Sequence, residues 1–189
     1  MVELENINEM QKYLALLRGI NVGGNNIIKM EDLKVAFKEM CFTDIKTYIQ
    51  SGNVIFNTEK SDKSALILLI ENSLSSKFSF QCTIVLLSRE ELQSQLNSAP
   101  SGFGQENELY RYDVIFLKEP VTVELAIKEI KLREGIDEVF TGENILFFRR
   151  KFTDLTKSKL SKIVSSPIYP YITIRNWNTS TKLMELMCD

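Results

Sequence analysis

The stretch "IKTYIQSGNVIFN" (residues 45–57) contains two strand-like runs joined by a tight turn. Ile45–Gln50 and Val54–Asn57 are rich in β-branched and aromatic residues, which favour strands. Ser51-Gly52-Asn53 between them is a strong signal for a hairpin turn. The sequence therefore predicts two antiparallel strands here, and the neighbouring elements decide which fold the hairpin belongs to.

The hairpin is preceded by a strand and a helix and followed by a helix and a strand. Before it, Tyr13–Arg18 is a short apolar run, and apolar residues recur at helical spacing over Met30–Met40. After it, Ser61 is placed to cap a helix that reaches Phe78, and Thr83–Leu87 is a further strand. The order strand-helix-strand-strand-helix-strand is the ferredoxin-like order, and a short trailing helix completes it.

The second half of the chain repeats this order. Its predicted elements are Tyr112–Leu117, Thr122–Lys131, Ile136–Phe140, Ile145–Arg149, Thr153–Val164, Tyr171–Arg175 and Thr179–Met187, of which the second, fifth and seventh are helices. Leu125 and Ile130 are expected to face inward from the first of these helices. The segment "NSAPSGFG" (residues 97–104) is typical of a linker.

The fold class predicted is α+β, with two tandem ferredoxin-like (βαββαβ) domains. Each has a mainly antiparallel four-stranded sheet and a trailing helix, at residues 1–97 and 105–189, joined by a linker at 98–104. Both faces of some strands are apolar: Ile84 and Leu86 point to one side, Val85 and Leu87 to the other. We therefore expect these faces to be buried by helices, by the other half or by a second chain, which leaves a monomer or a homodimer open.

Composition excludes several classes of site. The chain has no histidine, which removes the His-dependent catalytic triads and the commonest transition-metal ligand. Its three cysteines show none of the spacings of a zinc site, so no metal site is predicted, and neither a cofactor nor a catalytic residue can be named. No apolar run approaches a membrane span, and the first ten residues do not resemble a secretory signal. We expect a cytoplasmic protein with no membrane partner, and whether it is an enzyme stays open.

Charge is spread unevenly along the chain. Residues 1–142 carry 15 Lys/Arg and 21 Asp/Glu, whereas residues 143–189 carry 8 and 4. This asymmetry is consistent with an anionic partner for the C-terminal part. A solvated helix face opposite an acidic half is the alternative, and it is the commoner cause of such an asymmetry.

The connection "LLRGINVGGNNIIKM" (residues 16–30) is the first candidate site. Its glycines and asparagines tolerate positive φ, so successive N–H groups can face one point, and a helix begins just after it. The pattern matches neither GxGxxG nor the P-loop, and a purely structural corner is the alternative. Together with the hairpin it supplies the candidate ligand-binding residues Arg18, Asn21, Gly23, Gly24, Asn25, Lys29, Gln50, Ser51 and Asn53.

The second candidate is "TIRNWNTSTKL" (residues 173–183), where a strand ends and the last helix begins. Asn176 or Asn178 can cap that helix, and the only tryptophan, Trp177, can either plug a core edge or stack on a flat ligand. With the charges of Arg175 and Lys182, this segment completes the candidate set. Capping asparagines around a buried tryptophan are the structural alternative.

The three motifs "LLRGINVGGNNIIKMEDLKVAF", "TYIQSGNVIF" and "TIRNWNTSTKL" closely resemble an uncharacterised bacterial family, the domain of unknown function 1697. The resemblance spans about Tyr13 to Leu186. It implies two tandem ferredoxin-like domains and no established activity. Members usually carry glycine after the first helix, where this chain has Cys41 in "KEMCFTD". If that position is left-handed, Cys41 costs about 1 kcal/mol relative to glycine.

Three functions remain in competition. The sequence favours a protein that binds a small phosphorylated or carboxylated ligand, because amides and guanidinium groups suit oxyanions. Single-stranded nucleic-acid binding is the first alternative, since the element order is also that of the RNA-recognition motif, although Asn53 and Ile55 stand where stacking aromatic residues are wanted. The second alternative is a protein-interaction scaffold with no ligand.

Overall fold

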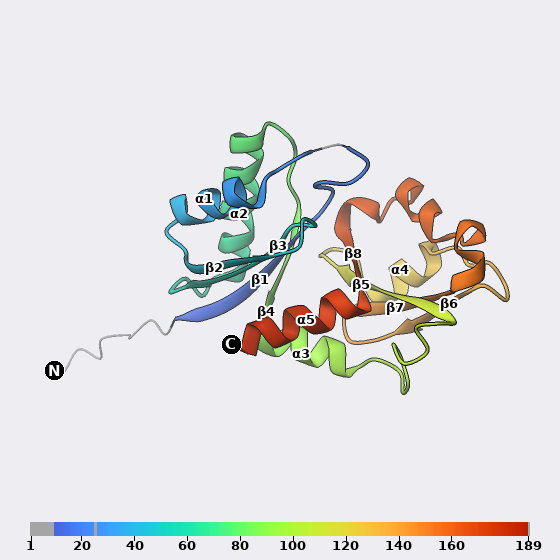
Figure 1. Cartoon of the computed structure of the whole chain (residues 1–189). Helices are drawn as coiled ribbons and strands as arrows, with labels where there is room; N and C mark the ends of the chain where they lie inside the picture. The colour runs from blue at the N-terminus through green and yellow to red at the C-terminus, as the bar shows by residue number, and fades with distance from the viewer. Residues whose placement is uncertain (1–9, 25, 189) are drawn as a thin grey trace. The chain divides into compact units, whose positions relative to one another are not determined.

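The computed structural model describes residues 10–24 and 26–188 as an α+β protein with two four-stranded antiparallel sheets (Figure 1). Contacts divide the chain within strand β4 (Ile84–Ser88). The N-terminal unit comprises the chain up to Cys82 with Leu86–Ser88, and the C-terminal unit comprises Thr83–Val85 and the chain from Arg89 onward. No helix in the described part of the chain is long and apolar enough to cross a membrane.

The N-terminal unit is built around a sheet with the strand order β2-β3-β1-β4. Its elements are β1 (Gln11–Leu17), α1 (Met30–Glu39), β2 (Thr43–Tyr48), β3 (Asn53–Thr58) and α2 (Lys63–Phe78), followed by β4. The central strands β1 and β3 are antiparallel, with Tyr13 opposite Phe56, and β2 pairs antiparallel with β3. The predicted hairpin is therefore confirmed.

Aromatic packing holds helix α1 against this sheet. The ring of Phe37 from α1 meets that of Phe56 from β3 edge to face at 5.3 Å, and Phe42 stacks on Phe56 at 4.4 Å. Leu66, Ile70 and Leu74 give α2 its buried face. The cap of α2 is one residue later than predicted: Asp62, not Ser61, accepts the backbone N–H of Ala65, at 3.0 Å, because a carboxylate at that position reaches the first-turn amides directly.

Helix α1 ends in a left-handed turn at Cys41, which is the condition under which Cys41 is less stable there than glycine. Cys41 has φ +65°, its N–H donates to Lys38 O, and the next N–H, of Phe42, donates to Phe37 O. These two bonds are the Schellman arrangement, in which glycine is favoured because it has no Cβ.

The C-terminal unit has the equivalent strand order, β6-β7-β5-β8. Its elements are α3 (Arg89–Asn97), β5 (Tyr110–Leu117), α4 (Val123–Glu129), β6 (Asp137–Thr141), β7 (Ile145–Lys151), three 3-10 segments η1 (Phe152–Lys157), η2 (Leu160–Ser165) and η3 (Tyr169–Tyr171), β8 (Ile172–Asn176) and α5 (Trp177–Cys188). Three antiparallel ladders join the strands. A core on one side of this sheet includes Ile115, Phe148, Ala126 and Ile163.

The helix predicted over Thr153–Val164 is wrong, because η1 and η2 occupy that stretch. Ser158 between them is extended, at φ −57° and ψ 143°. The segment is rich in Thr and Ser, which are poor helix formers, and the carboxylate of Asp137 accepts the N–H of Lys159 at 2.8 Å. That bond fixes the chain at the break and substitutes for helical pairing.

Two other expectations about packing have different outcomes. Leu125 is 43% exposed rather than inward, because the inward position of the short helix α4 belongs to Ala126, while Ile130 is buried as predicted. All four apolar residues of β4, from Ile84 to Leu87, are buried, as expected for strands with two apolar faces.

The predicted linker carries a packed side chain. Phe103 is buried, and its ring meets those of Tyr112, Phe147 and Trp177 edge to face at 4.7, 5.2 and 5.2 Å. Helix α3, which precedes this stretch, packs with α5 inside the C-terminal unit. The boundaries at 97 and 105 therefore stay a prediction, while the contacts divide the chain earlier, within β4.

Candidate functional site

The Gly/Asn loop, residues 19–26, is held closed by its own asparagine side chains. The Nδ2 of Asn21 donates to the carbonyl oxygens of Ile28 (3.0 Å) and Gln50 (2.9 Å), while its Oδ1 accepts the N–H of Ile28 (2.8 Å). The Nδ2 of Asn26 donates to Gly19 O, and the N–H of Asn21 donates to Asn26 O. Asn21 thus ties both ends of the loop to the β2–β3 hairpin, and both of its amide hydrogens are engaged.

Several loop positions have the left-handed backbone expected from their residue types. The φ angles are +53° at Asn21, +60° at Gly23, +77° at Gly24 and +49° at Asn26. Gly23 and Gly24 are exposed, and a Cβ built on Gly24 meets nothing within 4 Å. Asn25, the remaining candidate of the loop, lies outside the described residues.

The Ser-Gly-Asn hairpin packs against the start of this loop. A Cβ on Gly52, at φ +70°, would lie 2.7 Å from Ile20 Cδ1 and 2.8 Å from Leu17 Cβ, so only glycine fits. Asn53 is fully buried, and its Nδ2 donates to Tyr48 O and to Ser51 Oγ. The side chain of Asn53 therefore holds the turn, and a ligand cannot reach it without displacing those bonds.

The charged candidates of the N-terminal unit lie on either side of the loop. Arg18 is half-buried, and Lys29 is exposed at the residue before α1, where no side chain caps the helix. Glu31 and Asp32 occupy the first turn of α1. Their negative charge already interacts with the helix N-terminus and opposes a second anion there.

In the C-terminal unit, the Arg-Asn-Trp-Asn segment joins β8 to α5. Asn176 caps α5, since its Oδ1 accepts the N–H of Asn178 at 3.0 Å, and its Nδ2 donates to Tyr112 O. Trp177 is half-buried against Phe103 and Phe147, which is the core-edge position that the sequence left open. Asn178 and Lys182 are exposed, and Lys182 pairs with Glu185 at 2.7 Å.

Arg175 is a buried cation on β8. It is 8% exposed, and its Nη1 donates to Thr173 Oγ1 (2.7 Å) and to the carbonyl of Ile174 (2.9 Å). Burial lowers the pKa of Arg175 to about 10, so the group is still protonated at neutral pH. Replacing Arg175 with alanine would remove this buried and hydrogen-bonded side chain, so we expect the Arg175→Ala variant to lose stability. Grouping Arg175 with the loop and hairpin in one candidate set implies a shared site, and that shared site stays a prediction.

The family model for the protein of unknown function DUF1697 matches residues 10–147, most of the chain. The chain belongs to this family. The match includes the Gly/Asn loop and the hairpin, whereas the Arg-Asn-Trp-Asn segment lies beyond it. The chain is also similar to a solved structure, that of the conserved bacterial protein SP0830 from Streptococcus pneumoniae. The two share 28% identity and a TM-score of 0.82 over 95% of this chain and 99% of that one. No curated protein matches the chain.

This DUF1697 protein exposes apolar side chains where polar ligand contacts were expected. Val22 is 64% exposed, Ile27 75% and Ile49 49%. Each is the chain neighbour of a residue joined by the Asn21 side chain, namely Asn21 itself, Ile28 or Gln50. We call these three residues the apolar tip. The signal was present in the sequence, since Val22 and Ile27 lie within the quoted loop and Ile49 lies in the predicted strand, but the loop was interpreted from its glycines, asparagines and charges.

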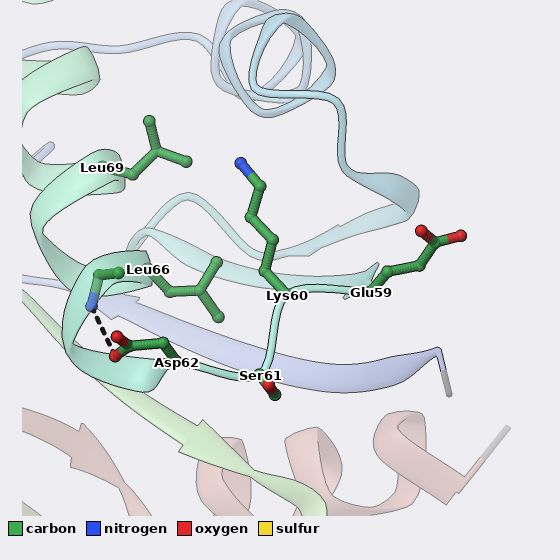
Figure 2. A pocket seen from close by; sticks show the side chains of 7 residues that line it. Glu59, Lys60, Ser61, Asp62, Leu66 and Leu69 are labelled. Carbon is green, nitrogen blue, oxygen red and sulfur yellow. Dashed lines mark hydrogen bonds between the residues drawn. The ribbon is translucent and has the colours of Figure 1, made fainter. Parts of the chain in front are cut away.

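A second feature of this DUF1697 protein, missed from the sequence, is a pocket of about 620 Å³ between β3 and α2. Figure 2 shows Leu66, Leu69 and Lys60 around it, with Glu59 and Ser61 pointing away. The full lining consists of Glu59, Lys60, Ser61, Asp62, Ala65, Leu66 and Leu69. A size of this order is typical of small-molecule sites.

Proposed function

We propose that the protein acts by binding another protein through the apolar tip of its N-terminal unit. The observation that carries this proposal is that Val22, Ile27 and Ile49 are exposed on a backbone fixed by the Asn21 hydrogen bonds. Exposed apolar side chains on a preorganised surface lose little conformational entropy on association, which favours binding. Internal use of the Asn21 and Asn53 amides also supports a scaffold rather than a polar ligand site.

A photo-crosslinking residue placed at Ile27 tests this function in cells. Leu68, which is 60% exposed on α2, is a matched control because it is also an apolar surface residue of the N-terminal unit. We expect discrete crosslinked species from position 27, lost when Val22 is also changed to Asp, and none from position 68. Equal crosslinking from both positions, or no effect of Val22→Asp, contradicts the proposal. The same bands from purified protein would identify a second copy as the partner.

A small anionic ligand is the second candidate, supported by two cations, Arg18 and Lys29, that flank the exposed Gly23 and Gly24 in the sequence. The anion would contact these two charges and backbone N–H groups, because the side-chain amides of Asn21 and Asn53 already form hydrogen bonds within the protein. Melting is measured with phosphate and with citrate, for the parent and for Lys29→Gln. A rise in melting temperature that Lys29→Gln abolishes and Lys38→Gln retains supports the site. No rise with either anion counts against it.

Nucleic-acid binding by base stacking has the least support. Tyr112 and Phe147 lie on the central strands of the C-terminal sheet, where such binding would need exposed rings, and both are buried.

We also infer a ferredoxin-like topology for both units, supported by the matching strand orders and by the antiparallel ladders. The cytoplasm stays our proposed compartment, in line with Cys41, Cys82 and Cys188, which form no disulfide in the described part of the chain.

A further inference from the structure

We propose that the pocket between β3 and α2 binds a small monocarboxylate with an apolar tail. This site is separate from the apolar tip and does not depend on the function proposed for it. The pocket has room for a small organic molecule, at about 620 Å³, and all of its lining belongs to the N-terminal unit.

One wall of the pocket is an apolar stripe of helix α2. Leu69 lies four residues after Ala65 and three after Leu66, so its side chain is the neighbour of both on one side of the helix. Leu66 is buried, whereas Ala65 is exposed and Leu69 half-buried, which leaves apolar surface open to the pocket. Removing that surface from water favours a ligand with a branched aliphatic tail.

Lys60 supplies the charge that selects the head group. Lys60 and Leu69 both line the pocket, and Figure 2 shows the Lys60 side chain extended. Within residues 10–24 and 26–188, Lys60 Nζ has no ion-pair partner. The ammonium group is thus available to a carboxylate at the rim while the tail contacts α2.

The neighbouring acids limit the head group to a single negative charge. Glu59 and Asp62 also line the pocket, so the two acids outnumber the one base, Lys60. Glu59 points away from the hollow, and one oxygen of Asp62 accepts the N–H of Ala65 as the cap of α2. Their negative charge remains close enough to disfavour a phosphate dianion relative to a carboxylate.

An NMR titration of the full chain tests the site with two probes of the same aliphatic skeleton, isocaproate and isohexylamine. We expect isocaproate to shift the backbone amide signals of residues 60–69, with a dissociation constant on the order of 1 mM. The amine should bind at least about tenfold more weakly, because it lacks the ion pair with Lys60. Binding of the amine as tight as that of the acid, or shifts confined to other residues, would overturn the proposal.

Variants separate the charge from the apolar wall. Lys60→Gln should weaken isocaproate binding about tenfold, since it removes the charge-assisted contact. Lys38→Gln, an exposed cation on α1, should leave it unchanged. Ala65→Phe places a ring in the pocket from an exposed position and should abolish binding, while an unchanged far-UV circular dichroism spectrum shows that the fold persists. Parent-like affinity in Lys60→Gln or in Ala65→Phe refutes the site.

Discussion

Replacing Cys41 with glycine should stabilise the protein. Cys41 follows the C-cap of α1 at φ +65°, and the two hydrogen bonds of the Schellman turn hold it there. The turn also brings the rings of Phe37 and Phe42 together at 5.9 Å, which is the hydrophobic contact that accompanies this motif. The backbone at Cys41 therefore cannot relax to negative φ without breaking the end of the helix.

The size of the gain follows from two opposing terms. A non-glycine residue in the left-handed region costs about 1–2 kcal/mol, and glycine avoids this cost. The greater freedom of glycine in the unfolded chain returns about 0.5–1 kcal/mol. The net expectation is a gain of about 1 kcal/mol, equivalent to about 2–4 °C in a chain of this size. Cys41 is exposed, so no packing is lost.

Urea unfolding of the parent, Cys41→Gly and Cys41→Ala measures this gain. Cys41→Ala removes the thiol but keeps Cβ, so its stability should match the parent. Far-UV circular dichroism follows both units, whereas the fluorescence of Trp177 follows the C-terminal unit alone. The gain should appear in the circular dichroism transition. A Cys41→Gly variant no more stable than Cys41→Ala would refute the reasoning.

Four further variants test the packing of the loop, the hairpin and the residues around Trp177. Gly52→Ala should lower the free energy of unfolding by about 2–4 kcal/mol, measured in urea, because its Cβ overlaps two apolar side chains. Gly24→Ala, at a similar φ but with open space around it, should lower it by only about 1 kcal/mol. Equal losses in the two variants would contradict the overlap. Gly104→Ala places a Cβ 2.2 Å from Trp177 Nε1, so the fluorescence emission should change, and an unaltered spectrum would show that the ring is not held there. Asn21→Ala removes three hydrogen bonds and should cost about 2–3 kcal/mol and speed proteolysis of the loop, whereas parent-like cleavage would mean that the loop is held by other contacts.

Local patterns in the sequence were sufficient for most of the fold. The hairpin around Gly52 and the repeated element order depend on turn chemistry and periodicity, which act over a few residues. The stretch Thr153–Val164 could not be predicted in the same way. Its break depends on a hydrogen bond between Asp137 and Lys159, which are 22 residues apart in the chain. The residues of the stretch itself therefore give no sign that the Asp137 carboxylate accepts a backbone N–H there.

The site shows the same division between local and distant effects. Residue type alone indicates that Asn21 tolerates positive φ, and the structure gives it φ +53°. Whether its amide is available to a ligand depends on Gln50, 29 residues further along the chain. The position of Trp177 likewise depends on Phe103 and Gly104, in a stretch that the sequence classed as a linker.

Comparing the two units shows which part of the Gly/Asn loop the fold does not require, because both units connect their first strand to the following helix. In the C-terminal unit, β5 connects to α4 through a short turn in which Val121 N–H donates to Lys118 O, and the sheet order is equivalent. The N-terminal unit makes the same connection with a longer loop that places Asn21 and Asn26 at positive φ and leaves Ile27 exposed. The exposed Ile27 adds nothing to folding stability, because its apolar surface stays in water. Because the equivalent sheet forms without this longer loop, we propose that the exposed apolar tip serves contact with a partner, which would remove that surface from water.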